Sequence, residues 1–120
     1  MKNELGGLEE RFADIVWAHE PVASGELVRI CEKELNWKKS TTYTVLRRLC
    51  EKELLQNVKG TVTSLVSRKD FYASKSAQIV EESYQGSLPS FIAAFVSTKK
   101  LTAEEAAEIR KMIDAYEKES

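Results

Sequence analysis

The chain has 120 residues, with 18 Lys and Arg against 19 Asp and Glu, one His and two Cys. This length suits one soluble domain or two small ones, and no apolar stretch is long enough for membrane insertion. The only histidine, His19, stands beside no recognisable nucleophile, and the glycines follow no phosphate-binding order. Composition therefore argues against an enzyme.

The two cysteines, Cys31 and Cys50, lie within apolar, helix-like segments. An isolated pair without a nearby histidine matches neither a zinc site nor a disulfide framework, so both are predicted to be core thiols. No metal and no cofactor is expected. The N-terminus lacks the residue order of a signal peptide, which predicts a cytoplasmic location.

Apolar residues at steps of three and four predict three helices in the first part of the chain. The first covers residues 5–17 and is broken by Pro21, and the second covers residues 24–35 with Ser24 as its N-cap. The third covers residues 37–49 and has a polar, cationic outer face. Its predicted buried side consists of Thr42, Val45, Leu46 and Leu49.

The pattern then changes to runs rich in β-branched residues. Residues 54–58 and 61–66 are separated by Lys59-Gly60, which predicts a hairpin. Helical spacing returns over residues 68–85, and a fifth helix begins near Pro89. The run from Thr102 to Glu105 is a capping box that begins the last helix.

Three helices followed by a hairpin are the order of a winged helix. In that fold the third helix enters the major groove of DNA and the hairpin reaches the flanking backbone. The predicted fold is therefore mainly α. It consists of an N-terminal winged helix-turn-helix with a small β-hairpin wing over residues 1–67, followed by a C-terminal helical dimerisation region over residues 68–120.

The third predicted helix lies in a segment without acidic side chains. Between Leu35 and Cys50 the charged residues are all basic, namely Lys38, Lys39, Arg47 and Arg48. Together with Ser, Thr and Tyr, these are residue types that hydrogen-bond phosphates and base edges. A helix face that meets only solvent can have the same charges, so charge alone leaves both interpretations open.

Several stretches also resemble a known family. They are Ile15-Val16-Trp17, the run from Trp37 to Leu55 that contains Thr41-Thr42-Tyr43-Thr44-Val45-Leu46-Arg47-Arg48-Leu49, and the segment Leu101-Thr102-Ala103-Glu104-Glu105. From Leu5 to about Lys118 the chain looks like the penicillinase repressor family. The resemblance implies a homodimeric transcriptional repressor whose operators are dyads with TACA/TGTA-like half-sites.

The resemblance also implies roles for individual residues. Ser40, Thr41 and Thr44 are expected to face base edges, and Arg48 to hold a backbone phosphate. Further DNA contacts are expected from Lys38, Lys39, Tyr43, Arg47 and Lys59. The chain departs from the family pattern where Lys38-Lys39 replaces the usual Ser-Pro, and in a second wing strand that is shorter and lacks the usual aromatic and arginine residues.

The second half carries more large apolar residues than three helices alone would hide. Those expected in a dimer interface are Ile79, Val80, Leu88, Phe91, Ile92, Phe95, Ile109, Met112 and Ile113. A two-fold partner would bury them and place two recognition helices about one DNA turn apart. An ordinary intramolecular core is the alternative.

In relatives that respond to β-lactams, a membrane-bound sensor metalloprotease leads to cleavage before a Phe ahead of the capping box. The matching bond here is Ala94-Phe95, and the resemblance implies such a sensor as a partner. The chain lacks the CxC motifs of the copper-responsive branch. Apart from DNA binding, the same fold could serve as a winged-helix protein-interaction module, and this alternative also stays open.

Overall fold

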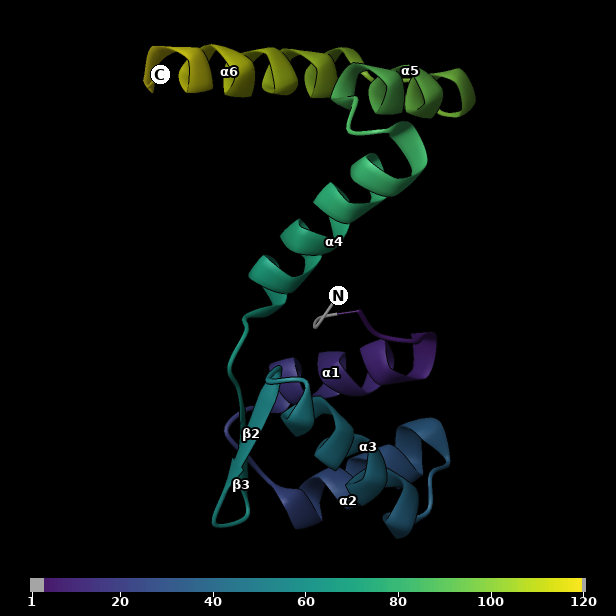
Figure 1. Ribbon diagram of the computed structural model, residues 1–120, viewed down its shortest axis with the longest axis vertical. Helices are drawn as coiled ribbons and strands as arrows, with labels where there is room; N and C mark the ends of the chain where they lie inside the picture. Colours follow the sequence, from purple (N-terminus) through teal and green to yellow (C-terminus); the bar gives the residue numbers. More distant parts are fainter. Residues whose placement is uncertain (1–3, 120) are drawn as a thin grey trace. The chain divides into compact units, whose positions relative to one another are not determined.

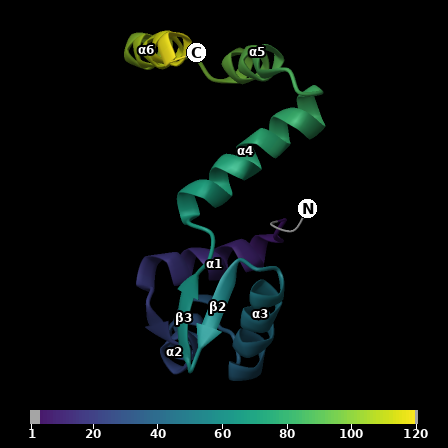
Figure 2. The ribbon, with the colours of Figure 1, turned by 60° about the vertical axis from the view of Figure 1, so that its left-hand side comes forward.

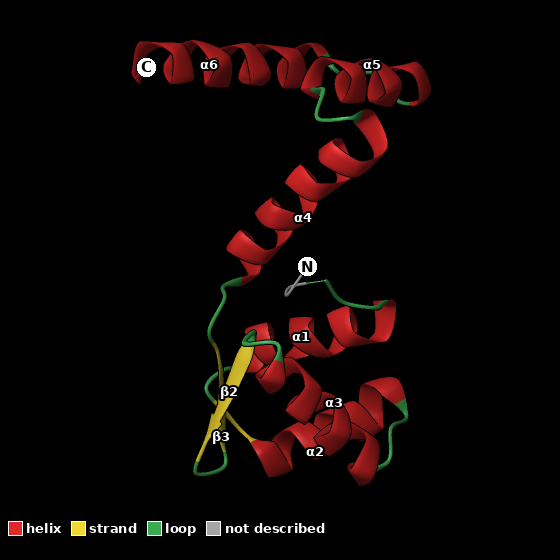
Figure 3. Ribbon diagram, viewed as in Figure 1, coloured by secondary structure: helices red, strands yellow, loops and turns green. Residues whose placement is uncertain are grey.

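The computed structural model describes residues 4–119 and has the predicted mainly α architecture (Figures 1 and 3). In chain order the elements are α1 (Gly7–His19), β1 (Val22–Ala23), α2 (Ser24–Leu35), α3 (Lys39–Glu51), β2 (Leu55–Val58), β3 (Thr61–Ser64), α4 (Arg68–Tyr84), α5 (Leu88–Thr98) and α6 (Ala103–Glu119). The helix, helix, helix, hairpin order of a winged helix-turn-helix is confirmed.

The chain divides into two compact units. The first extends to Ser76 and so includes the first half of α4, and the second runs from Ala77 onward. Within the described part of the chain, no helix is both long and apolar enough to cross a membrane.

The core of the first unit lies between α1, α2, α3 and the hairpin. It consists of Phe12, Ala13, Val16, Val22, Leu27, Cys31, Val45, Leu46, Leu49, Leu54, Leu55, Val62 and Phe71. The α3 residues recur at steps of three and four, as expected for one buried face of a helix. Trp37, just before α3, stacks on Phe12 with ring centroids 5.8 Å apart. The core therefore fixes the rotation of α3, and with it the direction of the outer face.

The wing is a three-stranded antiparallel sheet in the order β1-β3-β2. The two-residue strand β1 was not predicted, and it pairs Val22 with Val62. Lys59 and Gly60 both have positive φ, at 52° and 84°, as a type I′ hairpin turn requires. Figure 2 shows the two strands of the hairpin side by side, next to α3. The strands are shorter than predicted, because Leu54 precedes β2 and the residues after Ser64 leave the sheet.

Three predicted helix starts are corrected. The first helix begins at Gly7 rather than Leu5, and Ser24 is the first residue of α2 rather than its N-cap, since Ala23 holds that position. The third begins at Lys39 instead of Trp37. Lys38 occupies the N-cap without a side-chain hydrogen bond, which agrees with the absence of a capping residue there.

The second unit confirms the predicted helix signals. The Thr102 hydroxyl accepts from Glu105 N at 3.0 Å, and Glu105 Oε1 accepts from Thr102 N at 2.9 Å, which is the complete capping box. Ser87 caps α5, with Pro89 in its first turn. Neither α5 nor α6 contains a buried residue, so both helices leave apolar side chains exposed.

Candidate nucleic-acid interface

The outer face of α3 carries most of the predicted DNA contacts. Because the buried residues occupy one side of this helix, the period of 3.6 places Ser40, Thr44, Arg47 and Glu51 on the opposite side. The exposed predicted residues are Lys38, Lys39, Ser40, Thr41, Tyr43, Arg47, Arg48 and, on the wing turn, Lys59. Thr44 is half-buried.

Two arginines on this helix differ in their surroundings. Arg47 lies 4.0 Å from Glu51 Oε1, and its side chain is 72% exposed. An exposed pair at that distance contributes about 0–1 kcal/mol, so the guanidinium can turn to another anion. Arg48 is exposed on the flank nearer α1, where it helps to lower the pKa of Glu9 after the larger effects of the Gly6 N–H and Lys52.

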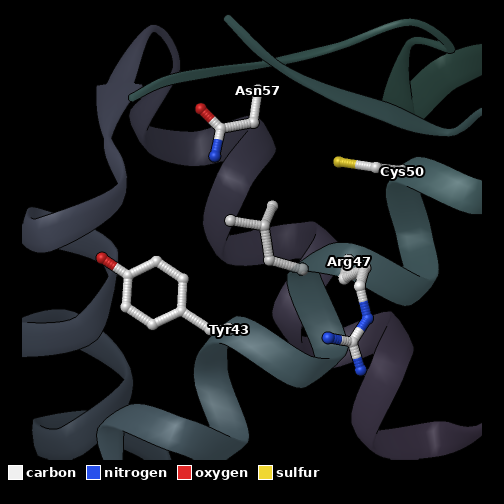
Figure 4. Close-up of a pocket in the computed structure, with 5 residues that line it drawn as sticks. Tyr43, Arg47, Cys50 and Asn57 are labelled. Atoms are coloured by element: carbon white, nitrogen blue, oxygen red, sulfur yellow. The ribbon is translucent and has the colours of Figure 1, made fainter. Parts of the chain in front are cut away.

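A groove of about 420 Å³ lies between α3 and β2. It is lined by Tyr43, Leu46, Arg47, Cys50 and Asn57. Figure 4 shows the Cys50 thiol and the Asn57 amide on its walls, with the Tyr43 ring across from Cys50. The Tyr43 hydroxyl donates to Ser24 Oγ at 3.4 Å. The groove therefore brings α3 and the wing together, and the Tyr43 hydrogen bond adds the start of α2.

Sequence reasoning missed Asn57 and Ser24 as members of this site. Asn57 follows the buried Leu55 by two residues and pairs with Val62. Alternation along a strand therefore places it on the inner face, toward α3. That alternation was a usable signal for Asn57, whereas the Ser24 contact depends on how α2 packs against α3.

The base of the wing is held by polar contacts from α1 and α2. The Glu20 carboxylate, directly after α1, accepts from Ser64 N at 2.8 Å and from Ser64 Oγ at 2.9 Å. Ser24 N donates to Gly60 O at 2.8 Å. These bonds hold the hairpin at its turn and at the end of β3, so Lys59 projects from an anchored support.

The environments of the two cysteines and the histidine are those of structural side chains. Cys31 is buried and Cys50 half-buried, and both are free thiols. Burial raises the pKa of both, and the Thr42 hydroxyl partly offsets this at Cys31. The core prediction is confirmed for Cys31, whereas Cys50 also borders the groove. His19 lies at the exposed end of α1 with Nδ1 2.9 Å from Ile15 O. Among residues 4–119 no group of three His, Cys, Asp or Glu could hold a metal ion.

A second surface lies on the second unit and on α4. Of the predicted dimer residues, Ile79, Leu88, Ile92, Phe95, Met112 and Ile113 are exposed, and Val80, Phe91 and Ile109 are half-buried. Val96 and Tyr116 are also exposed, and neither was predicted. A wholly apolar cavity of about 220 Å³ opens between α5 and α6, lined by Phe91, Ile92, Phe95, Val96, Leu101 and Ile109.

Comparison with known proteins agrees with this architecture. A family model described as "Penicillinase repressor" matches residues 5–115. The chain is 25% identical over 117 residues to the penicillinase repressor of Bacillus licheniformis, covering 94% of this chain and 91% of that protein. It is 23% identical over 115 residues to the methicillin resistance regulatory protein MecI of Staphylococcus aureus strain Mu50, covering 92% and 94%. Because the family match spans most of the sequence, the chain belongs to the penicillinase repressor family of transcriptional repressors.

Proposed function

We propose that this chain represses transcription by binding, as a homodimer, to a palindromic operator. The observation that carries the proposal is the exposed polar and cationic face of α3 on a winged helix, in a chain whose family match covers residues 5–115. A helix fits the major groove, and Ser, Thr and Arg are the side chains that contact base edges and phosphates there.

Each part of the site has a distinct role in this proposal. Ser40, Thr41 and Thr44, in the first half of α3, face base edges. Arg48 holds a phosphate from the flank of the helix, and Lys59 on the wing turn reaches the neighbouring backbone. Lys38, Lys39, Tyr43 and Arg47 add further DNA contacts.

The apolar surface of α4, α5 and α6 supports a second copy of the chain as the partner. Large side chains such as Leu88, Met112 and Ile113 are more than half exposed, at 55%, 64% and 51%. Contiguous apolar surface of this kind marks interaction sites. A two-fold dimer buries the same surface on both protomers and doubles the DNA contacts, which makes binding depend on a dyad.

The decisive experiment is fluorescence anisotropy of the purified chain on a duplex with a TACA/TGTA dyad against a scrambled duplex. It is run at two salt concentrations, with sedimentation of the same sample. We expect a dimer that prefers the dyad. Equal and strongly salt-dependent binding to both duplexes would contradict the operator assignment. No binding to either would favour the protein-interaction module, because that fold needs no specific DNA contact.

Two substitutions separate phosphate contacts from base contacts. Arg48→Ala should weaken binding to both duplexes alike and lower the salt slope by about one for each protomer. Thr44→Val keeps the shape of the side chain but removes its hydroxyl, so it should change the preference at one base position by about tenfold. Lys33→Ala, an exposed cation in the last turn of α2, is the matched control. If Arg48→Ala binds like the control, Arg48 does not face the DNA.

Release from DNA is proposed to follow proteolysis that a membrane-bound sensor metalloprotease triggers. The bond Ala94-Phe95 lies inside α5, and Ala94 is half-buried, so cutting requires local opening of the helix. A cut there removes the end of α5 and all of α6 from the dimer surface. A chain that ends at Ala94 should therefore sediment as a monomer and lose its dyad preference while its far-UV circular dichroism still shows the first unit folded. A stable dimer of this fragment would contradict the proposed release step.

A further inference from the structure

The first half of α4 is fixed to α1 by a polar cluster that no DNA contact explains. We call it the α1–α4 joint, and it consists of Glu10 and Asp14 on α1 with Arg68, Tyr72 and Lys75 on α4. Arg68 Nε donates to Asp14 Oδ1 at 3.0 Å, and Lys75 Nζ donates to Glu10 Oε2 at 2.5 Å. The Tyr72 hydroxyl lies 3.2 Å from Asp14 Oδ2 and 3.4 Å from Glu10 Oε1.

The residues of the joint repeat at helical spacing on both helices. Glu10 and Asp14 are four residues apart, and Arg68, Tyr72 and Lys75 follow at steps of four and three, so each set lies on one face of its helix. Both cations also lie over the Tyr72 ring, with Arg68 Cζ 4.7 Å and Lys75 Nζ 5.7 Å from its centroid. Burial raises the pKa of the Tyr72 hydroxyl, and the neighbouring Asp14 carboxylate raises it further.

An apolar layer supports the polar one. The Trp17 ring packs against Phe71 and Tyr72, with centroid distances of 5.5 and 6.0 Å. Its Nε1 donates to Val66 O at 2.9 Å, in the segment that leads into α4. The start of α4 is therefore held by aromatic packing, by a backbone bond and by charges, which together restrict its direction relative to α1.

The helix itself continues beyond the joint. It is continuous from Arg68 to Tyr84 without Pro or Gly, and such helices bend only gently. Its first half belongs to the winged-helix unit, and its second half belongs to the unit that carries the apolar surface. The joint therefore fixes the direction of the first half of α4 on the winged-helix unit.

We infer that the α1–α4 joint is a specificity-determining element that sets which half-site spacing the dimer accepts. This inference rests on the proposed function. In a two-fold dimer, adding one base pair between half-sites turns the second half-site by about a tenth of a turn. A stiff joint resists that rotation and favours one spacing, whereas a loosened joint tolerates several. Tyr72, Glu10 and Asp14 thus act as positioning residues without touching DNA.

The test compares dyads that differ only in the spacing between identical half-sites, by one and two base pairs in either direction. The Glu10→Gln/Asp14→Asn double variant removes both carboxylates from the joint. The matched control is Glu32→Gln/Glu34→Gln, which removes two exposed charges near the end of α2. Tyr72→Phe is a second probe, because it keeps the ring contacts and removes only the hydroxyl.

The measured quantity is the ratio of affinities for the best spacing and for one base pair away from it. We expect the double variant to lower this ratio by about tenfold, because both protomers lose two partly exposed ion pairs, although the amide oxygens can still accept from Tyr72. Tyr72→Phe should lower it less, and the control should keep the wild-type ratio. A purely structural role would weaken both duplexes alike and leave the ratio unchanged, and that result would overturn the inference.

Two outcomes with the wild-type chain distinguish a failure of this inference from a failure of the proposed function. If the wild-type chain does not distinguish a dyad from a scrambled duplex, the proposed function fails. If it selects the dyad but binds all spacings equally, the function stands and the role of the joint is wrong. Sedimentation of each variant shows that the comparison is made between dimers.

Discussion

At the scale of single residues, Thr42 stands out in the core of the winged helix. It is fully buried on the inner face of α3, and its hydroxyl oxygen has no hydrogen-bond partner that meets normal geometry among the described residues. Its polar neighbour is the Cys31 thiol, and a thiol is only a weak donor. A buried polar group without a strong partner lowers stability, because it loses its hydrogen bonds to water on folding.

Thr42→Val should therefore raise the free energy of unfolding by about 1 kcal/mol, since valine has nearly the same shape and no polar atom to desolvate. Urea unfolding followed by circular dichroism measures the change. Thr41→Val, on an exposed position one residue earlier, serves as the control and should stay within about 0.5 kcal/mol of wild type. A loss of stability in Thr42→Val would show that the hydroxyl has a strong partner after all.

At the scale of elements, the start of α1 depends on Glu9. Its Oε1 accepts from Gly6 N at 3.0 Å and lies 3.3 Å from Lys52 Nζ at the end of α3. The hydrogen bond from the Gly6 N–H lowers the pKa of Glu9, and Lys52 lowers it further. A carboxyl with a lowered pKa stabilises the fold above its unfolded-state pKa, and this contribution is lost as the pH falls through the folded-state pKa.

Glu9→Gln should accordingly cost about 1 kcal/mol of stability at pH 7, because the amide keeps an acceptor but loses the charge. The difference from wild type should begin to shrink as the pH falls below the unfolded-state pKa of about 4.3, and should vanish once the pH passes below the lowered folded-state pKa of Glu9. Urea unfolding at several pH values follows this convergence, with the exposed Glu32→Gln as a comparison. A difference that stays constant down to pH 3 would mean that charge is not the cause.

The elements show which parts of the fold can be predicted from sequence. Apolar spacing predicted the six helices, because burial of one helix face requires that spacing, and runs of β-branched residues on either side of Lys59-Gly60 predicted the hairpin. The ends of helices were less predictable. Ser24 was expected to be an N-cap but is the first residue of α2, and α3 begins at Lys39, two residues after the expected Trp37. The strand β1 contains only two residues, which is too short for any alternation to be visible.

The exposed face of α3 could be predicted from the sequence, whereas the rest of the candidate site could not. The period of α3 that buries Val45 and Leu49 also determines which of its side chains face outward, and these include the predicted Arg47 and Ser40. The groove depends instead on the packing of α3 against β2, so Asn57 and Ser24 entered the site only with the structure. Likewise, the α1–α4 joint pairs residues more than 50 positions apart, which no local pattern reveals.

At the scale of the whole molecule, the apolar surface of the second unit governs the oligomeric state in the proposed function. On α5 the side chains of Leu88, Ile92 and Phe95 follow at steps of four and three, and all three are exposed. On α6 the exposed Ile113 and Tyr116 repeat the same pattern. Faces of this kind resemble the positions that pack between helices of neighbouring protomers. The isolated chain leaves them in contact with water, which favours association.

Phe95→Asp places a charge in this surface and should prevent association, because burying an unpaired carboxylate is costly. The wild-type chain should sediment at twice the chain mass of 13.6 kDa and the variant at that mass. Without the second protomer, affinity for the dyad should fall by about a hundredfold, since one DNA-binding unit no longer holds the other close to its half-site.

Ser97→Asp is the matched control, because Ser97 lies on nearly the opposite side of α5 and is exposed. It should leave both the mass and the affinity unchanged. A wild-type chain that sediments as a monomer would contradict the homodimer, whereas a dimeric Phe95→Asp would place the interface on another surface of the second unit.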